Sequence, residues 1–372
     1  MIKTVLLVLS AMLAGGAWLG VRFARMLTRA RPAMRRRTAV WLGVAAVAPL
    51  LFFFALWGLF AYLVMILAAG DLAGLCLSRW RWGGMWWGKA WRGGMTGVAL
   101  AVCVCAYGFY HVLDIRVTRY DITLSKPQAG RPVPHSKLRA VLITDTHLGK
   151  AIRAPQLDAL AARVNALAPD IVFLGGDIYD DKTPPELVDH SMGVWRALKA
   201  PLGVWYVGGN HEHARYAGAH MAGVFPRLKA AGVRVLEDEH ALVGGAFYVV
   251  GRKDLSIRDR LGAAELTRAL DKTRPVIMLD HQPVGMARTA DAGVDLLLCG
   301  HTHAGQIWPF GYAVRLLSRN EVVYGRARFG NMQAIVSSGA GAWGFSMRVG
   351  TNSEIVLLDI AFAPGKNKGE TP

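Results

Sequence analysis

Cysteine and acidic residues are the two things that this sequence has in short supply. It contains four cysteines among 372 residues, namely Cys76, Cys103, Cys105 and Cys299, and the first three lie in apolar stretches. Their number and spacing exclude a disulfide framework and a zinc site built from thiolates. Charged residues make up only 19% of the chain, below the roughly 25% of typical soluble proteins. This composition excludes intrinsic disorder as the dominant state.

The shortage of acidic residues is concentrated in the first 113 positions. There Asp71 is the only acid against 12 lysines and arginines, so this part carries +11 of the total net charge of +17. The later residues carry the remaining +6. Because most of the excess lies beside apolar runs, it indicates membrane topology rather than a surface for phosphate backbones. We therefore expect no nucleic-acid partner.

Four apolar runs within residues 1–113 predict an all-α transmembrane anchor. They cover residues 4–21, 39–56, 58–78 and 95–113. A spanning helix needs about 20 apolar residues, so the stretch from 39 to 78 is long enough for two passes. The first run also fits a signal peptide, but it lacks a convincing small-residue cleavage site, and we interpret it as an uncleaved anchor.

Two basic loops, 22–37 and 79–94, predict the orientation of this anchor. Lysine and arginine favour the cytoplasmic side, and four spans place both loops there, whereas three would place the second loop outside. We therefore expect four spans, membrane lipids as neighbours, and a later domain outside the cytoplasm. Loop 79–94 also contains five tryptophans among its cations. This mixture suits the lipid headgroup layer better than a surface that stacks RNA bases.

Residues 114–363 alternate short apolar segments with amphipathic or loop sequence. The predicted strands read IRVTRYDITL, LRAVLIT, DIVFLGG, GVWYVGG, AFYVVG, RPVIMLD, DLLLCG, QAIVSSG and EIVLLDI. Such alternation predicts an α/β or α+β domain with largely buried strands packed in layers. The tail over 364–372 is expected to be disordered.

Five of these strands run directly into carboxylate, imidazole or amide side chains. In chain order the clusters are Asp145-Thr146-His147, Gly176-Asp177, Asn210-His211-Glu212, Asp280-His281 and His301-Thr302-His303. One such cluster alone is more often structural, but five in succession at strand ends predict one shared crevice. Nitrogen and oxygen donors of this kind suit manganese, iron, zinc or cobalt, and they suffice for two ions. Two cations about 3.5–4 Å apart can clamp a displacement at phosphorus, with a hydroxide between them as the nucleophile.

The series D-x-H, G-D-x-x-D, G-N-H-E, a single H and G-H-x-H resembles the calcineurin-like metallophosphoesterase superfamily over residues 115–362. The segments GHTHAGQI and SSGAGAWGFSMRVGTNSEIVLL are similar to a bacterial branch of membrane-anchored phosphodiesterases. That branch includes enzymes resembling UDP-2,3-diacylglucosamine pyrophosphatases. The resemblance implies a four-layer α/β/β/α sandwich. With the anchor, it implies a multi-pass protein of the bacterial inner membrane whose catalytic domain is periplasmic.

The resemblance also implies roles for single residues. The first metal would be held by Asp145, His147, Asp177 and His303. The second would be held by Asp177, Asn210, His281 and His301, with Asp177 as the bridge. His211 matches the non-ligand histidine that protonates the leaving oxygen or stabilises charge on the phosphoryl group. Asp180 is expected to support the ligands or cap a helix. Glu212 stands where many members of the superfamily have aspartate.

The sequence thus predicts a membrane-anchored phosphoesterase with two divalent metals, manganese being favoured over iron, zinc and cobalt. Its substrate would be a phosphodiester or phosphomonoester, lipid-linked or part of the cell envelope. One alternative is a membrane transporter or receptor that uses the domain as a sensor. The other is a UDP-diacylglucosamine pyrophosphatase-type enzyme of lipid A synthesis, if the domain is cytoplasmic. Within the predicted spans only Asp71 offers a charged group for a transport path, which disfavours the transporter.

Overall fold

The computed structural model describes residues 2–52, 57–77, 95–127, 137–213, 223–309, 311–312, 316 and 318–364. The chain divides into two compact units, Met1–Gly108 and Phe109–Pro372. The whole of the tryptophan-rich loop 79–94 lies outside the described residues, as does the expected disordered tail after residue 364.

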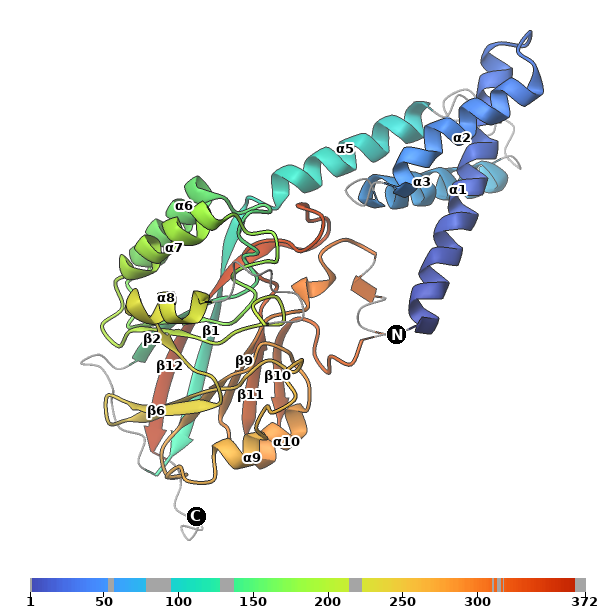
Figure 1. The fold of residues 1–372 in the computed structure, drawn as a ribbon. Coiled ribbons are helices and arrows are strands. Elements are labelled where there is room, and N and C mark those ends of the chain that lie inside the picture. The colour runs from blue at the N-terminus through green and yellow to red at the C-terminus, as the bar shows by residue number, and fades with distance from the viewer. Residues whose placement is uncertain are drawn as a thin grey trace. The chain divides into compact units, whose positions relative to one another are not determined.

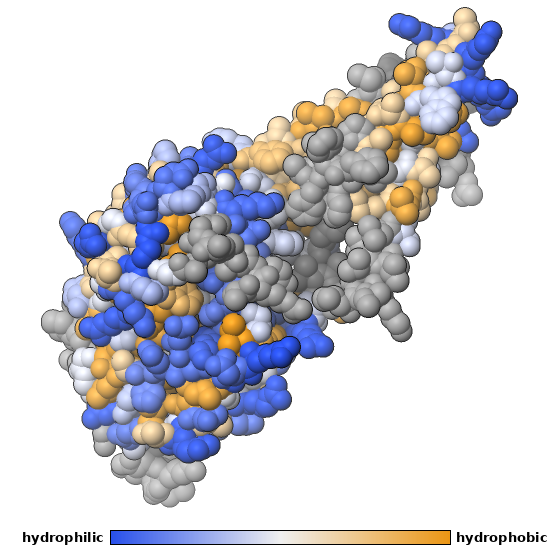
Figure 2. Space-filling model, in the orientation of Figure 1, coloured by the Kyte–Doolittle hydropathy of each residue, from blue (hydrophilic) through white to orange (hydrophobic). Residues whose placement is uncertain are grey.

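Helices make up the described part of the first unit (Figure 1). They are α1 (Ile2–Ala30), α2 (Arg36–Phe52), α3 (Trp57–Leu77) and most of α5 (Met95–His111). Helices α1 and α2 cross so closely that a Cβ on Gly43 would lie 2.4 Å from the carbonyl oxygen of Gly20. Arg22 of α1 pairs with Asp71 of α3, so this acid is neutralised by a neighbouring helix. Hydrophobic side chains cover much of the visible helix surface in Figure 2.

The prediction of a transmembrane anchor is wrong. No helix within the described ranges combines the length and the apolar character needed to cross a membrane. Helices α2 and α5 have 17 residues each, fewer than the ~20 that a span requires. Helix α1 continues through Arg22, Arg25 and Arg29 instead of ending before them. The predicted multi-pass location in the inner membrane, with a periplasmic catalytic domain, is contradicted together with the anchor.

Two six-stranded sheets form the framework of the second unit (Figure 1). The first sheet contains, in spatial order, β1 (Ile115–Lys126), β12 (Ser353–Pro364), β2 (Lys137–Ile143), β3 (Ile171–Leu174), β4 (Val204–Tyr206) and β5 (Arg234–Val235). The second contains β10 (Gly325–Phe329), β11 (Met332–Val336), β9 (Leu296–Cys299), β8 (Val276–Leu279), β7 (Phe247–Gly251) and β6 (Glu239–Val243). Every strand predicted from the sequence is present, and β5, β6 and β10 are additional.

Alternating side chains on the strands separate the apolar residues into layers. Leu138 and Leu142 of β2 point into the core between the two sheets, whereas Val141 and Ile143 point to the opposite face. That outer face is covered by α6 (Ala154–Ala166), α7 (Pro185–Arg196) and α8 (Val224–Ala230). Helices α9 (Ala263–Leu266) and α10 (Met286–Asp291) cover the outer face of the second sheet. The layers of the second unit agree with the predicted α/β/β/α sandwich. The other part of that fold prediction, the transmembrane anchor, is the part that is wrong.

Strand direction brings the ends of distant segments together. Strands β2, β3 and β4 run parallel to one another in the first sheet, as do β7, β8 and β9 in the second. The carboxyl ends of parallel strands meet at one edge of a sheet. The loops that carry the polar clusters therefore gather at one edge of each sheet.

Candidate metal centre

The seven predicted metal ligands all lie in turns that follow strands. Asp145 and His147 follow β2, Asp177 follows β3, Asn210 follows β4, His281 follows β8, and His301 and His303 follow β9. Five of them have a left-handed backbone with positive φ, namely Asp145, His147, Asp177, His301 and His303. Such a conformation costs a non-glycine residue about 1–3 kcal/mol. It persists only where the surrounding structure imposes it, and here it is concentrated on the ligand turns.

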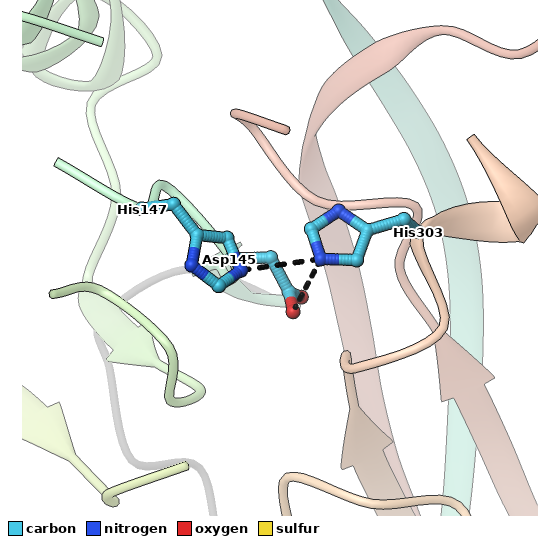
Figure 3. Close-up of side chains that lie close together, drawn as sticks. All are labelled: Asp145, His147 and His303. Carbon is cyan, nitrogen blue, oxygen red and sulfur yellow. Dashed lines mark hydrogen bonds and ion pairs between the residues drawn. The ribbon is translucent and has the colours of Figure 1, made fainter. Parts of the chain in front are cut away.

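Asp145, His147 and His303 form the first group of potential ligands, and Figure 3 shows their side chains pointing toward one another. The Nε2 atoms of the two histidines are 3.2 Å apart. Asp145 Oδ1 lies 3.5 Å from His303 Nε2. One potential ligand atom from each residue falls within 4.8 Å of the other two, and all three side chains are buried. This spacing leaves room for one cation among them.

Asp177, His281 and His301 form the second group, with ligand atoms again within 4.8 Å of one another. Oδ2 of Asp177 lies 3.0 Å from His281 Nε2 and 3.9 Å from His147 Nε2. The same carboxylate oxygen therefore borders both groups. Asn210 is adjacent, because a Cβ on the preceding Gly209 would lie 2.3 Å from Asp177 Oδ1. Only glycine allows this close approach of the Asn210 loop to the carboxylate.

Each group contains residues from both sheets, and direct hydrogen bonds join the two sheets at this site. The backbone N–H of His301 donates to Oδ1 and Oδ2 of Asp145 at 3.0 and 3.1 Å. A Cβ on Gly300 would lie 2.2 Å from Asp145 Oδ2, so glycine is required before His301. The Asp145 turn of the first sheet is thus held against the His301 turn of the second.

Hydrogen bonds to the ring nitrogens orient two of the imidazoles. His281 Nδ1 donates to the carbonyl oxygen of Gly175 at 2.9 Å, and His147 Nδ1 lies 3.1 Å from Asp180 Oδ2. Each bond places a proton on Nδ1 and turns Nε2, with its lone pair, toward the carboxylates. Nδ1 of His303 is buried and has no hydrogen-bond partner among the described residues. Facing lone pairs beside carboxylates repel one another, and a cation between them removes the repulsion. The residues present therefore fit two divalent metal ions.

The histidines of the two groups differ in the direction of their pKa shifts. Burial disfavours a charged His281, but the carboxylates of Asp177 and Asp145 outweigh it and raise the pKa of this imidazole well above its usual value. Burial and the neighbouring His147 lower the pKa of His303 well below its usual value. Burial together with His281 lowers the pKa of His301 to about 4. The two buried carboxylates thus draw cationic partners to the site.

Asp180 connects a ligand histidine to His211. Its Oδ2 lies 3.1 Å from His147 Nδ1 and 4.0 Å from His211 Nδ1. The rings of these two histidines meet edge to face with centroids 4.9 Å apart. Burial lowers the pKa of His211, and the carboxylates of Asp177 and Asp180 counteract that effect. Asp180 is hydrogen-bonded to the predicted ligand His147, and it does not cap α7, whose N-cap is Pro184.

Glu212 has a role that the sequence did not reveal. Its buried carboxylate accepts backbone N–H bonds from Asp177 at 3.0 Å, Tyr179 at 2.9 Å and Gly209 at 2.8 Å. It therefore ties the turn after β3 to the turn after β4. Burial raises the pKa of this carboxyl to about 7. Its place in the G-N-H-E motif was visible in the sequence, but its backbone partners were not.

Arg348 also went unnoticed in the sequence. It is completely buried, and its guanidinium donates to the carbonyl oxygens of Gly341 at 2.8 Å, His303 at 3.1 Å and Gly339 at 3.2 Å. It lies 45 residues after His303 in the chain and outside every ligand cluster, so no spacing signal could have identified it. Burial lowers the pKa of Arg348 to about 10, which still leaves it cationic at neutral pH.

Comparisons with known proteins identify the family. The model of the calcineurin-like phosphoesterases matches residues 138–305, a range that contains all seven ligand candidates. A metallophosphoesterase of Aquifex aeolicus is 30% identical over 268 residues, which cover 70% of this chain and 97% of the relative. The chain belongs to the calcineurin-like metallophosphoesterases. The prediction of a metal-dependent phosphoester hydrolase is confirmed at the level of this family.

Other metallophosphoesterases share only part of their length with this one. A metallophosphoesterase of Campylobacter jejuni is 36% identical over 235 residues, which cover 61% of this chain and 61% of the relative. A Bos taurus relative, named a transmembrane protein with metallophosphoesterase domain, is 29% identical over 260 residues. These cover 65% of this chain and 57% of the relative. The comparisons confirm the superfamily but not the UDP-diacylglucosamine pyrophosphatase-like branch.

Proposed function

We propose that this metallophosphoesterase hydrolyses phosphodiester or phosphomonoester bonds with two divalent cations. The observation that carries the proposal is the position of Asp177 Oδ2, at 3.0 Å from His281 Nε2 and 3.9 Å from His147 Nε2. One oxygen that borders two imidazole-rich groups is the arrangement that a bridging carboxylate requires. When bound, two such cations supply positive charge to the phosphoryl oxygens and lower the pKa of water.

The proposed ligands divide between the two cations. Asp145, His147, Asp177 and His303 would hold the first, and Asp177, Asn210, His281 and His301 the second. We propose manganese as the metal, because hard oxygen ligands and imidazoles together suit it, with iron, zinc and cobalt as the competitors. The catalytic domain is proposed to span residues 114–363.

We assign the proton transfer to His211. Its Nδ1 faces Asp180 Oδ2 at 4.0 Å, which leaves Nε2 to donate a proton to the leaving oxygen as the bond to phosphorus breaks. The backbone N–H of His211 also donates to Asp177 Oδ1 at 2.9 Å. That bond places the imidazole beside the proposed bridging carboxylate, where the scissile phosphate would lie.

The experiment uses the purified full chain, stripped with a chelator and reloaded with Mn²⁺. Hydrolysis of bis(4-nitrophenyl) phosphate and of 4-nitrophenyl phosphate is measured before and after reloading, with Fe²⁺, Zn²⁺ and Co²⁺ in parallel. We expect activity only in the reloaded protein and about two metal ions per chain by elemental analysis. A folded protein that binds two ions and hydrolyses neither ester at any pH between 5 and 9 would contradict the proposal.

Among phosphoesters, we propose a lipid-linked or cell-envelope phosphoester as the substrate. The test compares phosphodiesters that differ only in the length of their acyl chains, dispersed in the same detergent. A higher kcat/KM for the long-chain ester supports this substrate class. Equal values for both chain lengths contradict it and leave the proposed reaction intact.

A further inference from the structure

Trp343 presents a large apolar ring to solvent beside the proposed proton donor. Its indole is 49% exposed, and its ring centroid lies 6.1 Å from that of His211, with the planes tilted by 51°. The proposed ligands and the proton transfer make no use of this residue. An indole exposed at the edge of a site offers a broad contact surface with little conformational freedom to lose.

The loop that carries Trp343 is fastened at several points. The Gln306 side chain accepts the backbone N–H of Trp343 and donates to its carbonyl oxygen, both at 2.9 Å. The same amide donates to the carbonyl oxygen of Phe345 at 2.8 Å. The N–H of Gly341 donates to the carbonyl oxygen of Asp145 at 2.9 Å. The backbone under the indole is therefore held by the turns that carry Asp145 and His303.

We propose that Trp343 forms a subsite for the leaving group, on which a planar ring carried by the leaving alcohol stacks. This inference rests on the proposed function, because His211 marks the leaving-group side only if it protonates the leaving oxygen. A group that departs from phosphorus toward His211 passes the adjacent indole. Aromatic and heterocyclic rings stack on such a face in offset or edge-to-face geometry.

The test compares two phosphodiesters whose leaving phenols have comparable acidity but different ring area, namely bis(4-nitrophenyl) phosphate and bis(4-methylumbelliferyl) phosphate. We expect the manganese-loaded protein to show a lower KM for the two-ring ester. Trp343→Ala should raise that KM about 10-fold, which corresponds to about 1.4 kcal/mol, and should leave kcat nearly unchanged. Trp343→Phe should keep most of the difference in KM between the two esters.

Trp308→Ala is the matched control. Trp308 is 56% exposed and directly follows the bridge between Ile307 and Val349, which joins its segment to the loop of Trp343. The control should leave KM for both esters unchanged. Metal content by elemental analysis shows whether each variant retains its centre.

Two results would overturn the subsite. One is an unchanged KM for both esters in Trp343→Ala. The other is a loss confined to kcat, which would show that the indole acts through His211 rather than on the substrate. Failure of the proposed function is distinguishable from both, because the wild-type protein would then hydrolyse neither ester.

Discussion

His147 and His303 face each other with their Nε2 atoms 3.2 Å apart, although 156 positions separate them in the chain. His147 follows β2 of the first sheet and His303 follows β9 of the second. The first ligand group therefore exists only when the two sheets are packed together. A cation bound there would connect the sheets directly, so metal binding and stability should be linked.

Metal removal is expected to lower the thermal stability of the second unit. Saturation at 100 times Kd adds about 2.7 kcal/mol to the free energy of unfolding, or about 5–10 °C in Tm for a domain of this size. The measurement is thermal unfolding with Mn²⁺ and with a chelator. Identical midpoints in a protein shown to bind two ions would contradict the linkage.

Asp177→Asn should reduce kcat more than any other single ligand substitution. The amide cannot supply the negative charge that the carboxylate presents to both groups. Removing a residue that only supports a ligand costs about 10–100-fold, so loss of the bridge should exceed about 100-fold. Turnover is measured with Mn²⁺ present, and metal content should fall below two ions per chain. The exposed Asp189→Asn serves as the control, and near-normal turnover in Asp177→Asn would show that the bridge is misplaced.

His211→Gln should separate proton transfer from metal binding. His211 is proposed as a proton donor and not as a ligand, so its loss should lower kcat about 100- to 10,000-fold. Metal content should remain at two ions per chain, as measured by elemental analysis. A variant that loses a metal ion would assign His211 to the ligands instead.

Asp180→Asn should lower kcat/KM or metal affinity, but by less than Asp177→Asn lowers kcat. The Asp180 carboxylate lies 3.1 Å from Nδ1 of the proposed ligand His147 and 4.0 Å from His211 Nδ1, so it would influence a bound metal only through His147. We expect kcat/KM or metal affinity to fall about 10–100-fold. Titration of the stripped protein with Mn²⁺ measures the affinity. An effect as large as that of Asp177→Asn would make Asp180 a ligand in its own right.

Arg348→Met should destabilise the fold. The substitution removes a buried cation that donates to the carbonyl oxygens of His303, Gly339 and Gly341. The oxygens of His303 and Gly339 keep a backbone N–H donor, whereas that of Gly341 loses its guanidinium donor. Leaving a buried acceptor unsatisfied costs about 1–3 kcal/mol, which urea unfolding of the stripped protein would reveal. The exposed Arg116→Met is the control. Equal unfolding midpoints for the two variants would contradict this role.

Sequence reasoning recovered those parts of the protein that depend on local pattern. Strands such as Leu296–Cys299 were predictable because short apolar runs bounded by glycine and polar residues leave few other structures. The same reasoning failed in the first unit. There the apolar stretch 4–21 does not end at Arg22, since α1 continues to Ala30. Helix ends depend on backbone hydrogen bonds and contacts with neighbouring helices, such as the pair of Arg22 and Asp71, which hydropathy does not report.

The sequence by itself determined which clusters belong together, because polar residues that follow parallel strands must emerge at one edge of a sheet. Only the tertiary structure decided how these clusters meet. The bonds from the His301 backbone to Asp145, from Glu212 to the Asp177 turn and from Arg348 to His303 join segments far apart in the chain. Each depends on the distance between two loops after the sheets have packed. That distance is a property of the three-dimensional fold, and no spacing along the chain encodes it.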